Sequence, residues 1–167
     1  MELFIVRHGI AQDRDDPTVR SDGERELTRE GRDKTALAAE GLKRMGCRPE
    51  LIAASPLVRA QQTAEVIAEV LCPEVAVQTC EGLGPGGGTG EIIEWLRPLA
   101  ENSVMLVGHM PNVAETTGVL LAGRASVEMV FKKAATCCIL FDGAPEAGRG
   151  VLKWLLQQRE LRARAEK

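Results

Sequence analysis

The chain has 167 residues, a formal net charge of −3 at pH 7, and only three phenylalanines, two tryptophans and no tyrosine. This length favours one domain with a sizeable core, while the charge and the scarcity of aromatic side chains argue against a nucleic-acid-binding protein. No apolar run approaches the roughly 20 residues that a membrane span needs, and the N-terminus lacks a secretory signal pattern, so we expect a cytoplasmic protein without membrane contact.

The first predicted element is a strand over residues 3–6, which Arg7, His8 and Gly9 end abruptly. The apolar run is too short for a helix and is typical of a strand buried on both faces. An open α/β sheet places its chemistry just outside the carboxyl ends of its strands. An arginine and a histidine at this point indicate anion recognition beside a nucleophile or base, and Gly9 would let a ligand approach the backbone. Residues 11–26 are polar and are predicted to form a loop over the strand end.

Amphipathic helices and short apolar strands alternate along the rest of the chain. Thr28 is predicted to cap a helix that ends at Gly46. Ser55 and Pro56 are predicted to cap and open a second helix, which Pro73 ends. The further expected elements are strands over 51–54, 75–77 and 104–107, a glycine-rich connecting loop over 82–90, and helices over 92–99 and from Pro111 onward.

The last part of the chain completes the predicted fold. Residues 135–141 and 151–156 are expected to form two strands, which pair antiparallel because the link between them is short. The whole pattern predicts an α/β fold, a three-layer α/β/α sandwich with a mostly parallel central sheet and this antiparallel strand pair. We expect a single domain over residues 1–157, followed by a charged C-terminal tail over residues 158–167 that forms a frayed helix.

The chain has five cysteines and no Cys-x-x-Cys pair. An odd number of unpaired cysteines in such a protein indicates reduced, mostly buried thiols. A cysteine phosphatase needs an arginine six positions after its nucleophilic cysteine, and none of the five has one. The sequence therefore excludes that chemistry.

The candidate site combines three segments that are far apart in the sequence. His8 and His109 are the only histidines, and each directly follows a predicted buried strand. Neighbouring strand ends in one sheet can bring both to one ligand. Arg59 lies in the first turn of the helix after the strand over 51–54, where the helix N-terminus already favours anions. With Arg7, this arrangement predicts a phosphate-type site.

These residues resemble the histidine phosphatase superfamily. The similarity rests on four motifs in order: Arg7-His8-Gly9, Leu27-Thr28 with Gly31, Ser55-Pro56 with Arg59, Ala60, Gln62 and Thr63, and Gly108-His109. It extends from Met1 to about Gln157. The short chain, the loop with Leu83, Pro85 and Gly87, and the lack of a large insertion are most similar to the SixA-type phosphohistidine phosphatases.

The resemblance implies a histidine phosphatase-like fold and a phosphohistidine phosphatase that needs no cofactor and no metal. His8 would be the nucleophile, and water would hydrolyse the resulting phosphohistidine. Arg7, Arg59 and His109 would hold the phosphoryl oxygens, and Arg25 would be a further phosphate contact. The arginines would supply the positive charge that Mg²⁺ supplies elsewhere. The implied partners are a phosphate ion and a phosphorylated phosphotransfer or phosphocarrier protein.

One departure from the family pattern bears on the substrate. Other branches carry an acidic residue as general acid in the segment that corresponds to the loop after Leu83. Residues 84–90 hold no carboxylate, and Glu81 is only a displaced candidate. Because an imidazole leaving group needs a proton donor less than an alkoxide does, the missing acid favours a phosphoramidate substrate. It equally permits a slow phosphatase or a phosphate-binding relic.

Three functions therefore stay open. The first is a phosphatase that acts on phosphohistidine in a protein, the second a small phosphomonoesterase for a metabolite or nucleotide, and the third a non-catalytic phosphate- or phosphopeptide-binding module. A binding module needs the positive charges but not a nucleophilic imidazole, so the intact histidine pair argues against the third. The sequence does not identify the acceptor that would orient His8.

Overall fold

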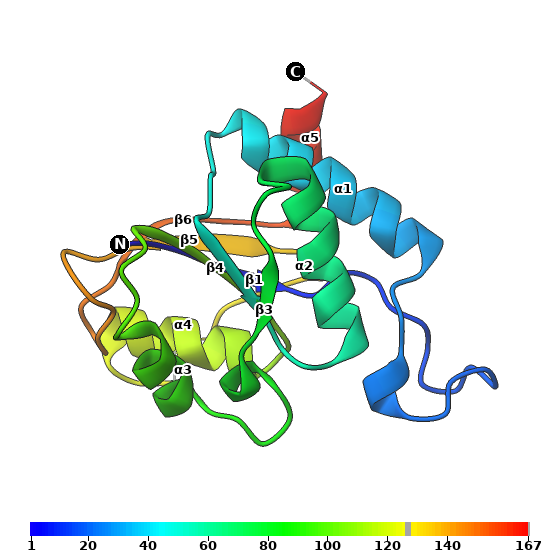
Figure 1. Cartoon of the computed structure of the whole chain (residues 1–167), viewed down its shortest axis with the longest axis horizontal. Helices are drawn as coiled ribbons and strands as arrows, with labels where there is room; N and C mark the ends of the chain where they lie inside the picture. The colour runs from blue at the N-terminus through cyan, green and yellow to red at the C-terminus, as the bar shows by residue number, and fades with distance from the viewer. Residues whose placement is uncertain (126–127, 167) are drawn as a thin grey trace.

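The computed structural model describes residues 1–125 and 128–166, and within these ranges the chain forms a three-layer sandwich around a six-stranded sheet (Figure 1). The strands are β1 (Glu2–Arg7), β2 (Leu51–Ala54), β3 (Val77–Thr79), β4 (Ser103–Gly108), β5 (Thr136–Leu140) and β6 (Val151–Leu156). The α-helices are α1 (Arg29–Arg44), α2 (Val58–Leu71), α3 (Thr89–Leu96), α4 (Asn112–Ala122) and α5 (Gln158–Ala165). Short 3₁₀ turns are η1 (Asp22–Glu24) and η2 (Glu81–Leu83).

The order of the strands across the sheet is β3-β2-β4-β1-β5-β6. The first four run parallel to one another, whereas β5 runs antiparallel to both β1 and β6. This confirms the predicted fold class, including the antiparallel pair late in the chain. Since β2, β4 and β1 are parallel neighbours, their carboxyl ends meet at one edge of the sheet.

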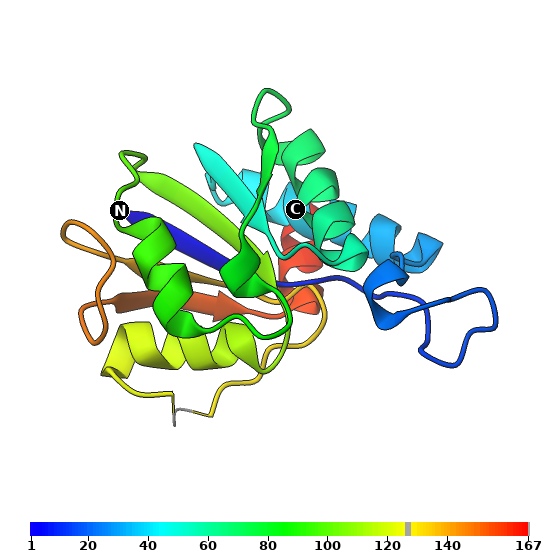
Figure 2. The ribbon, with the colours of Figure 1, turned by 60° about the horizontal axis from the view of Figure 1, so that its bottom comes forward.

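The two faces of the sheet are covered by different helices (Figures 1 and 2): α1, α2 and α5 lie on one face, and α3 and α4 on the other. Each face of the sheet packs against its helices in a separate hydrophobic core, and successive side chains of β1 alternate between these two cores, as strand geometry requires. Phe4 and Val6 pack in the core beneath α1, α2 and α5, and Leu3 and Ile5 pack in the core beneath α3 and α4. All four are almost completely buried. The apolar run thus fixes β1 in the middle of the molecule.

The first helix begins and ends as predicted. The Thr28 side chain accepts a hydrogen bond of 2.9 Å from the backbone N–H of Gly31, which satisfies one free donor of the first turn. Met45 follows the last helical residue, and Gly46 then takes a left-handed φ of +80° that suits glycine. Gly31 has a second role, because a Cβ atom there would overlap the carbonyl oxygen of Ile10. The absence of a side chain lets α1 start against the segment that follows His8.

The start of α2 differs from the prediction. Ser55 and Pro56 do not open the helix, which begins at Val58 with Leu57 as its N-cap. Ser55 instead prolongs the line of β2, because its backbone N–H donates to the carbonyl oxygen of Val107 at 2.9 Å. Its hydroxyl accepts from the backbone N–H of Leu57, the residue before the helix, at 3.3 Å, and makes no cap to the first turn of α2.

Two further element boundaries are shifted. The strand expected over residues 75–77 lies two residues later, because the N–H of Val75 is used in a turn to the carbonyl of Cys72. The helix expected over residues 92–99 begins earlier, after the N-cap Gly88, so part of the predicted glycine-rich loop is helical.

Residues 158–165 of the predicted tail form an ordered helix, α5, and are not frayed. Gln157 and Glu160 form a capping box at the start of α5. Leu161 is fully buried within the same core as α1 and α2. One large apolar side chain in a charged sequence gives no periodic signal, which is why the pattern did not predict this packing. The segment is part of the packed structure.

Gly41 is the point where α5 packs most closely on α1. A Cβ atom at Gly41 would overlap the carbonyl oxygen of Leu161, and a backbone atom cannot swing away as a flexible side chain can. We expect Gly41→Ala to lower the free energy of unfolding, because overlap with a backbone atom should cost near the upper end of the usual overpacking range of about 1–3 kcal/mol. This would outweigh the roughly 1 kcal/mol that alanine gains over glycine in a helix. Thermal denaturation followed by circular dichroism measures the difference.

Gly90 in α3 provides the matched control, because a Cβ atom there has open space around it. Gly90→Ala should leave the melting temperature unchanged or raise it slightly. A Gly41→Ala variant that melts at or above the temperature of the unsubstituted protein would contradict the close packing of α5 on α1.

The five cysteines are all free and buried, as predicted. Burial raises the pKa of the Cys47 thiol to about 11 and that of the Cys137 thiol to about 12. None of the helices within the described residues is long and apolar enough to cross a membrane.

Candidate active site

Three strand ends form the floor of the site. The register of β1 and β4 sets Arg7 opposite Gly108, and the backbone N–H of His8 donates to the carbonyl oxygen of Gly108 at 2.9 Å. His8 and His109 therefore follow their strands side by side, with ring centroids 4.9 Å apart. Ser55 follows β2 on the other side of β4, and its Oγ lies 2.8 Å from Nε2 of His109. The sheet thus aligns the two histidines and the serine in a row.

His8 is held in one tautomer by the backbone of the next residue. Its Nδ1 lies 2.8 Å from the carbonyl oxygen of Gly9. Because a carbonyl oxygen only accepts, Nδ1 must carry the proton, and Nε2 keeps its lone pair. Gly9 is fixed in turn by its N–H, which donates to Thr63 Oγ1 at 3.0 Å, and the Thr63 hydroxyl donates to the carbonyl oxygen of Arg59 at 2.6 Å. The carbonyl oxygen of Gly9 is thus the acceptor for His8 that the sequence did not identify.

The surroundings of His8 keep its imidazole neutral. The ring is buried, and burial together with the nearby Lys133 and His109 lowers its pKa to about 2. Burial, followed by the charges of Arg59 and Lys133, lowers the pKa of His109 to about 4. Both imidazoles are therefore uncharged at neutral pH, so neither repels the cations around it.

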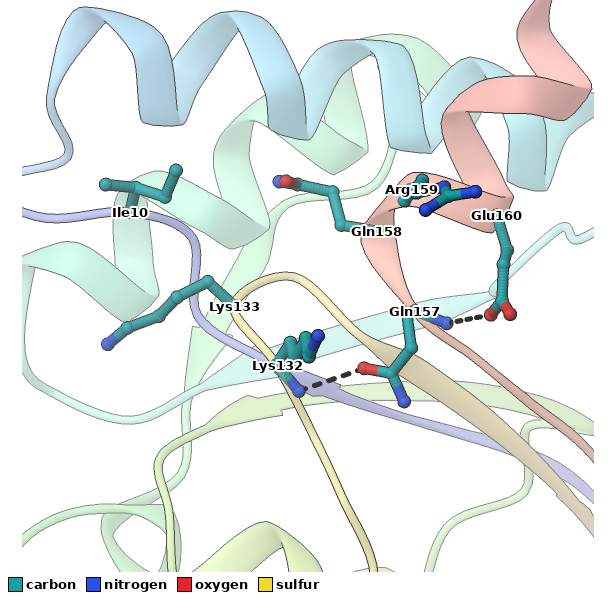
Figure 3. A pocket seen from close by; sticks show the side chains of 7 residues that line it. All are labelled: Ile10, Lys132, Lys133, Gln157, Gln158, Arg159 and Glu160. Atoms are coloured by element: carbon teal, nitrogen blue, oxygen red, sulfur yellow. Dashed lines mark hydrogen bonds between the residues drawn. The ribbon is translucent and has the colours of Figure 1, made fainter.

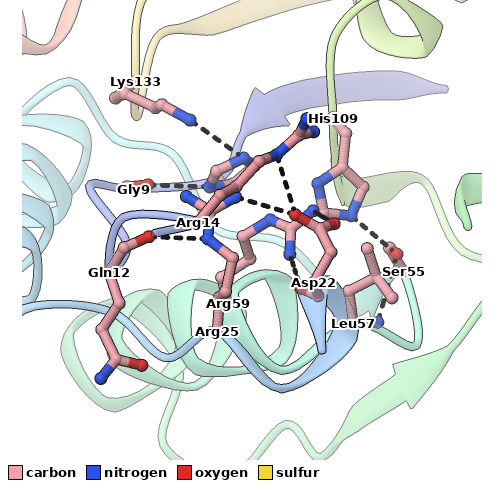
Figure 4. Close-up of polar contacts among 11 residues, drawn as sticks. Gly9, Gln12, Arg14, Asp22, Arg25, Ser55, Leu57, Arg59, His109 and Lys133 are labelled. Atoms are coloured by element: carbon pink, nitrogen blue, oxygen red, sulfur yellow. Dashed lines mark hydrogen bonds and ion pairs between the residues drawn. The ribbon is translucent and has the colours of Figure 1, made fainter. Parts of the chain in front are cut away.

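Arg59 is buried in the first turn of α2 and points at the loop over the strand end. Its two terminal nitrogens donate to Asp22, one to the backbone carbonyl at 2.6 Å and one to the carboxylate Oδ2 at 3.0 Å. Figure 4 shows the Asp22 carboxylate among the side chains of Arg14, Arg25 and Arg59. Asp22 Oδ1 pairs with Arg25 at 3.0 Å and with Arg14 at 3.2 Å. The hydrogen bond from Arg25, followed by Arg59, lowers the pKa of Asp22 to about 2.

Arg7 reaches the site from the end of β1. One terminal nitrogen donates to the backbone carbonyl of Phe131 at 2.6 Å. Its Nε is buried without a hydrogen-bond partner among the described residues, and the same holds for Nε of Arg59 and Nδ1 of His109. Unsatisfied buried donors on two guanidinium groups are costly unless an acceptor joins them. They favour an anion at this place.

The outer part of the site is a cleft of about 290 Å³. Its lining residues are Asp22, Leu57, Arg59, Leu83, Gly84, Pro85, Gly86, Gly87, His109, Met110, Pro111, Asn112 and Glu115. The glycine-rich loop, expected to be a connector, thus forms part of the cleft wall. Glu81 is exposed in η2 and does not line the cleft. Within residues 1–125 and 128–166, no group of three or more His, Cys, Asp or Glu side chains could hold a metal ion.

The structure brings together all the residues that the sequence singled out for the site. Arg25 joins them indirectly, since it pairs with Asp22 and donates through Nε to the backbone carbonyl of Gln12 at 2.6 Å. Three further residues were missed. Ser55 could have been found, because it follows a buried strand just as the histidines do. Asp22 and Lys133, whose Nζ lies 3.2 Å from Nε2 of His8, carry no motif or period that marks them.

Comparisons with known proteins agree with a site for a phosphate-type anion. A family model described as histidine phosphatase superfamily (branch 1) matches residues 3–84. An uncharacterised protein of Picosynechococcus sp. (strain ATCC 27264 / PCC 7002 / PR-6) is 39% identical over 138 residues, 80% of this chain and 81% of the relative. Phosphohistidine phosphatase SixA of Escherichia coli (strain K12) is 30% identical over 157 residues, 92% of each chain.

The fold leads to the same family. The structure of the protein histidine phosphatase SixA complexed with tungstate superposes with a TM-score of 0.84, at 29% identity, covering 96% of this chain and 99% of that one. Together with the relative in Escherichia coli, this confirms the resemblance that the four sequence motifs predicted. The chain belongs to the histidine phosphatase superfamily, in its SixA-type branch, and is a phosphatase.

Proposed function

We propose that this phosphatase removes phosphoryl groups from phosphohistidine in another protein, through a covalent phosphohistidine formed at His8. The observation that carries the proposal is the hydrogen bond between His8 Nδ1 and the carbonyl oxygen of Gly9. It leaves the lone pair on Nε2, where the charges of Lys133 and Arg59 act on the ring. A neutral, oriented imidazole is a competent nucleophile at neutral pH, and a covalent intermediate divides one difficult displacement into two easier ones.

The reaction consists of two displacements at phosphorus. In the first, Nε2 of His8 bonds to phosphorus while the bond between phosphorus and the substrate imidazole breaks. The substrate nitrogen that leaves keeps the bonding electron pair. The other nitrogen of the substrate imidazole carries a proton that it has taken from water. In the second, a water oxygen bonds to phosphorus, the bond to Nε2 breaks, and the water proton leaves with the phosphate or to solvent. His8 returns to its starting tautomer, because Nδ1 keeps its proton and its hydrogen bond to the carbonyl oxygen of Gly9 throughout.

The cations of the site suit the charge that develops on the phosphoryl oxygens. Arg7 and Arg59 each keep a buried Nε–H without a protein partner among the described residues, and His109 lies beside His8. Donors fixed in advance around equatorial oxygens are the main source of catalysis in phosphoryl transfer. Tungstate is a tetrahedral oxyanion like phosphate, so its presence in the SixA structure supports an oxyanion as a ligand of this protein too. We further propose that no metal or cofactor takes part.

The carboxylates near the site support phosphohistidine as the substrate. Asp22 lines the cleft, but its arginine partners keep it ionised, so it has no proton to donate near neutral pH. Glu81 lies outside the cleft lining. A phosphoester needs a donor for its alkoxide, whereas a protonated imidazole leaves unaided. The name of the Escherichia coli relative, phosphohistidine phosphatase, agrees with this preference.

A second candidate, a phosphomonoesterase, has one observation in its favour. Glu115 at the start of α4 is exposed and lines the cleft together with Arg59 and His109. A carboxylic acid there would be a proton donor for an ester leaving group. An ester hydrolase would lose activity in Glu115→Gln, whereas the proposed phosphohistidine phosphatase would not.

Substrate preference tests the proposal. The protein is incubated in EDTA with a protein phosphorylated on histidine and, separately, with phosphoserine protein and glycerol 2-phosphate, two esters that release an alkoxide. We expect kcat/KM for the phosphohistidine substrate to exceed that for the esters by at least about 10²-fold. This is the smallest usual contribution of a general acid, which the site does not supply to an ester leaving group. Acid-labile, alkali-stable phosphate should appear on His8. Faster ester hydrolysis, or activity that EDTA removes and a divalent metal restores, would contradict the proposal.

A further inference from the structure

Lys133 is the side chain nearest to the reactive nitrogen of His8 outside the residues with an expected role. Its Nζ lies 3.2 Å from Nε2 of His8, on the segment that precedes β5 (Figure 4). An ammonium group only donates, and Nε2 only accepts while Nδ1 carries the proton. The lysine therefore covers the lone pair that would attack phosphorus. It reaches the site from a different element than Arg59 does.

The backbone around Lys133 is tied to the strand that carries His8. The N–H of Ala134 points at two carbonyl oxygens, 3.0 Å from that of Arg7 and 3.2 Å from that of His8. Ala134 is buried and has a φ of +55°, a left-handed conformation that alanine rarely adopts. On the other side, the Arg7 side chain holds the carbonyl oxygen of Phe131. These contacts place Lys133 over the end of β1 at the cost of local strain.

Gln157, the N-cap of α5, holds the backbone of the segment before Lys133. Gln157 accepts from the backbone N–H of Lys132 at 3.0 Å and donates to the carbonyl oxygen of Val130 at 2.7 Å. Figure 3 shows Lys133 on one side of a groove of about 550 Å³, with the first turn of α5 opposite. The backbone is thus fixed while the half-buried side chain borders open space, so Nζ has room to shift.

The charges around Lys133 are almost all positive. The titratable or charged groups that act on it from the ends of β1 and β4, the 11–26 loop and α2 are Arg7, His8, Arg14, Arg25, Arg59 and His109, and Asp22 pairs with three of these arginines. From α5, Arg159 and Glu160 lie across the groove, and Glu160 is engaged by the backbone of Gln157. A fifth cation among four arginines and one carboxylate is unfavourable by itself, and it becomes favourable when a phosphoryl group brings negative charge.

We propose that Lys133 is a further catalytic residue, whose ammonium covers Nε2 of His8 in the free enzyme and moves to a phosphoryl oxygen as His8 attacks. The inference rests on the proposed role of His8. In the free state the ammonium satisfies a buried lone pair that otherwise has no partner. In the transition state it adds a donor to those that Arg7 and Arg59 would supply. Lys133 keeps its three protons throughout, so no proton transfer is involved.

The pH profile follows from the same surroundings. Burial, with the charges of Arg7 and the other arginines, lowers the pKa of Lys133 to about 8. The protonated form is the active one, so activity should be complete well below pH 8 and should fall as the pH rises through that value. An arginine stays protonated over this range. Lys133→Arg should therefore remove the alkaline decline while keeping a donor near the phosphoryl group.

The test compares Lys133→Met, Lys133→Arg and the neighbouring exposed Lys132→Met as a matched control. We expect Lys133→Met to lower kcat/KM for phosphohistidine protein by about 10²–10³-fold, the loss typical of one oxyanion donor. We expect Lys132→Met to stay within a few-fold of the unsubstituted enzyme. Lys133→Arg should retain activity at pH 9 where the unsubstituted enzyme has declined. Thermal melting verifies that each variant is folded.

Single-turnover labelling separates this inference from the proposed function. If the unsubstituted enzyme forms no phosphohistidine at His8, the proposed function fails whatever Lys133 does. If it forms phosphohistidine, and Lys133→Met forms it at the same rate, only the role of Lys133 is wrong. An alkaline limb that Lys133→Arg leaves unmoved would overturn the inference as well, even if Lys133→Met failed to fold.

Discussion

Replacement of His8 by alanine is expected to abolish phosphatase turnover, with a fall in kcat/KM of roughly 10⁶-fold, as when the nucleophile of a covalent catalyst is removed. The reason is geometric. Nε2 of His8 is the nitrogen left with a lone pair by the hydrogen bond from Nδ1 to Gly9. Among the described residues, only the Lys133 side chain, which borders open space, covers that lone pair. Nε2 of His109, in contrast, is paired with the buried Ser55. Steady-state assays on phosphohistidine protein measure the loss, and phosphate-induced thermal stabilisation shows whether the anion site survives.

His109→Gln is the control for this prediction. It removes the second imidazole but keeps the proposed nucleophile, so it should be slow and yet still trap acid-labile phosphate on His8. A His8→Ala variant that becomes phosphorylated at His109 and turns over would show that the two histidines have the opposite roles.

The second large effect is expected at Arg59. Arg59→Ala should lose about 2.7–4 kcal/mol of transition-state stabilisation, equivalent to a 10²–10³-fold fall in kcat, as for removal of one oxyanion donor. Arg59 is buried at the start of α2, so water cannot replace its charge easily. Arg59→Lys keeps the charge but loses the two-pronged geometry, and it should be intermediate. Steady-state kinetics that separate kcat from KM measure the effect.

Arg59 also anchors the 11–26 loop through Asp22, so a control must separate anchoring from catalysis. Arg14 is exposed and pairs with the same carboxylate. Since exposed ion pairs contribute little, Arg14→Ala should leave kcat within a few-fold. If Arg59→Ala retains activity within the same few-fold range, our description of the phosphoryl site is wrong.

The central parts of the fold were predictable because they depend on local pattern. The apolar runs of β1 and β4 are buried on both faces, and Thr28 caps α1 through a hydrogen bond three residues away. The position of α5 was not predictable in this way. Its packing depends on one leucine, Leu161, and on the absence of a side chain at Gly41, and neither forms a periodic pattern.

The site likewise has a part that local sequence patterns predict and a part that they do not. The meeting of His8 and His109 follows from parallel strands in one sheet, so two short motifs sufficed to predict it. The contacts of Asp22 and Lys133 depend on the paths of long loops across the strand ends. Such paths are set by tertiary hydrogen bonds, for example the two that Gln157 makes to the segment before Lys133. No local signal encodes them.

The burial of all five thiols bears on how the protein responds to oxidants. Peroxides attack the thiolate form of cysteine, and enzymes with an activated cysteine are inactivated for that reason. Here burial raises the thiol pKa values of Cys47 and Cys137 far above neutrality, and the proposed nucleophile is an imidazole, which peroxides do not readily oxidise. Dephosphorylation by this protein should therefore continue under oxidative stress that stops cysteine-dependent phosphatases.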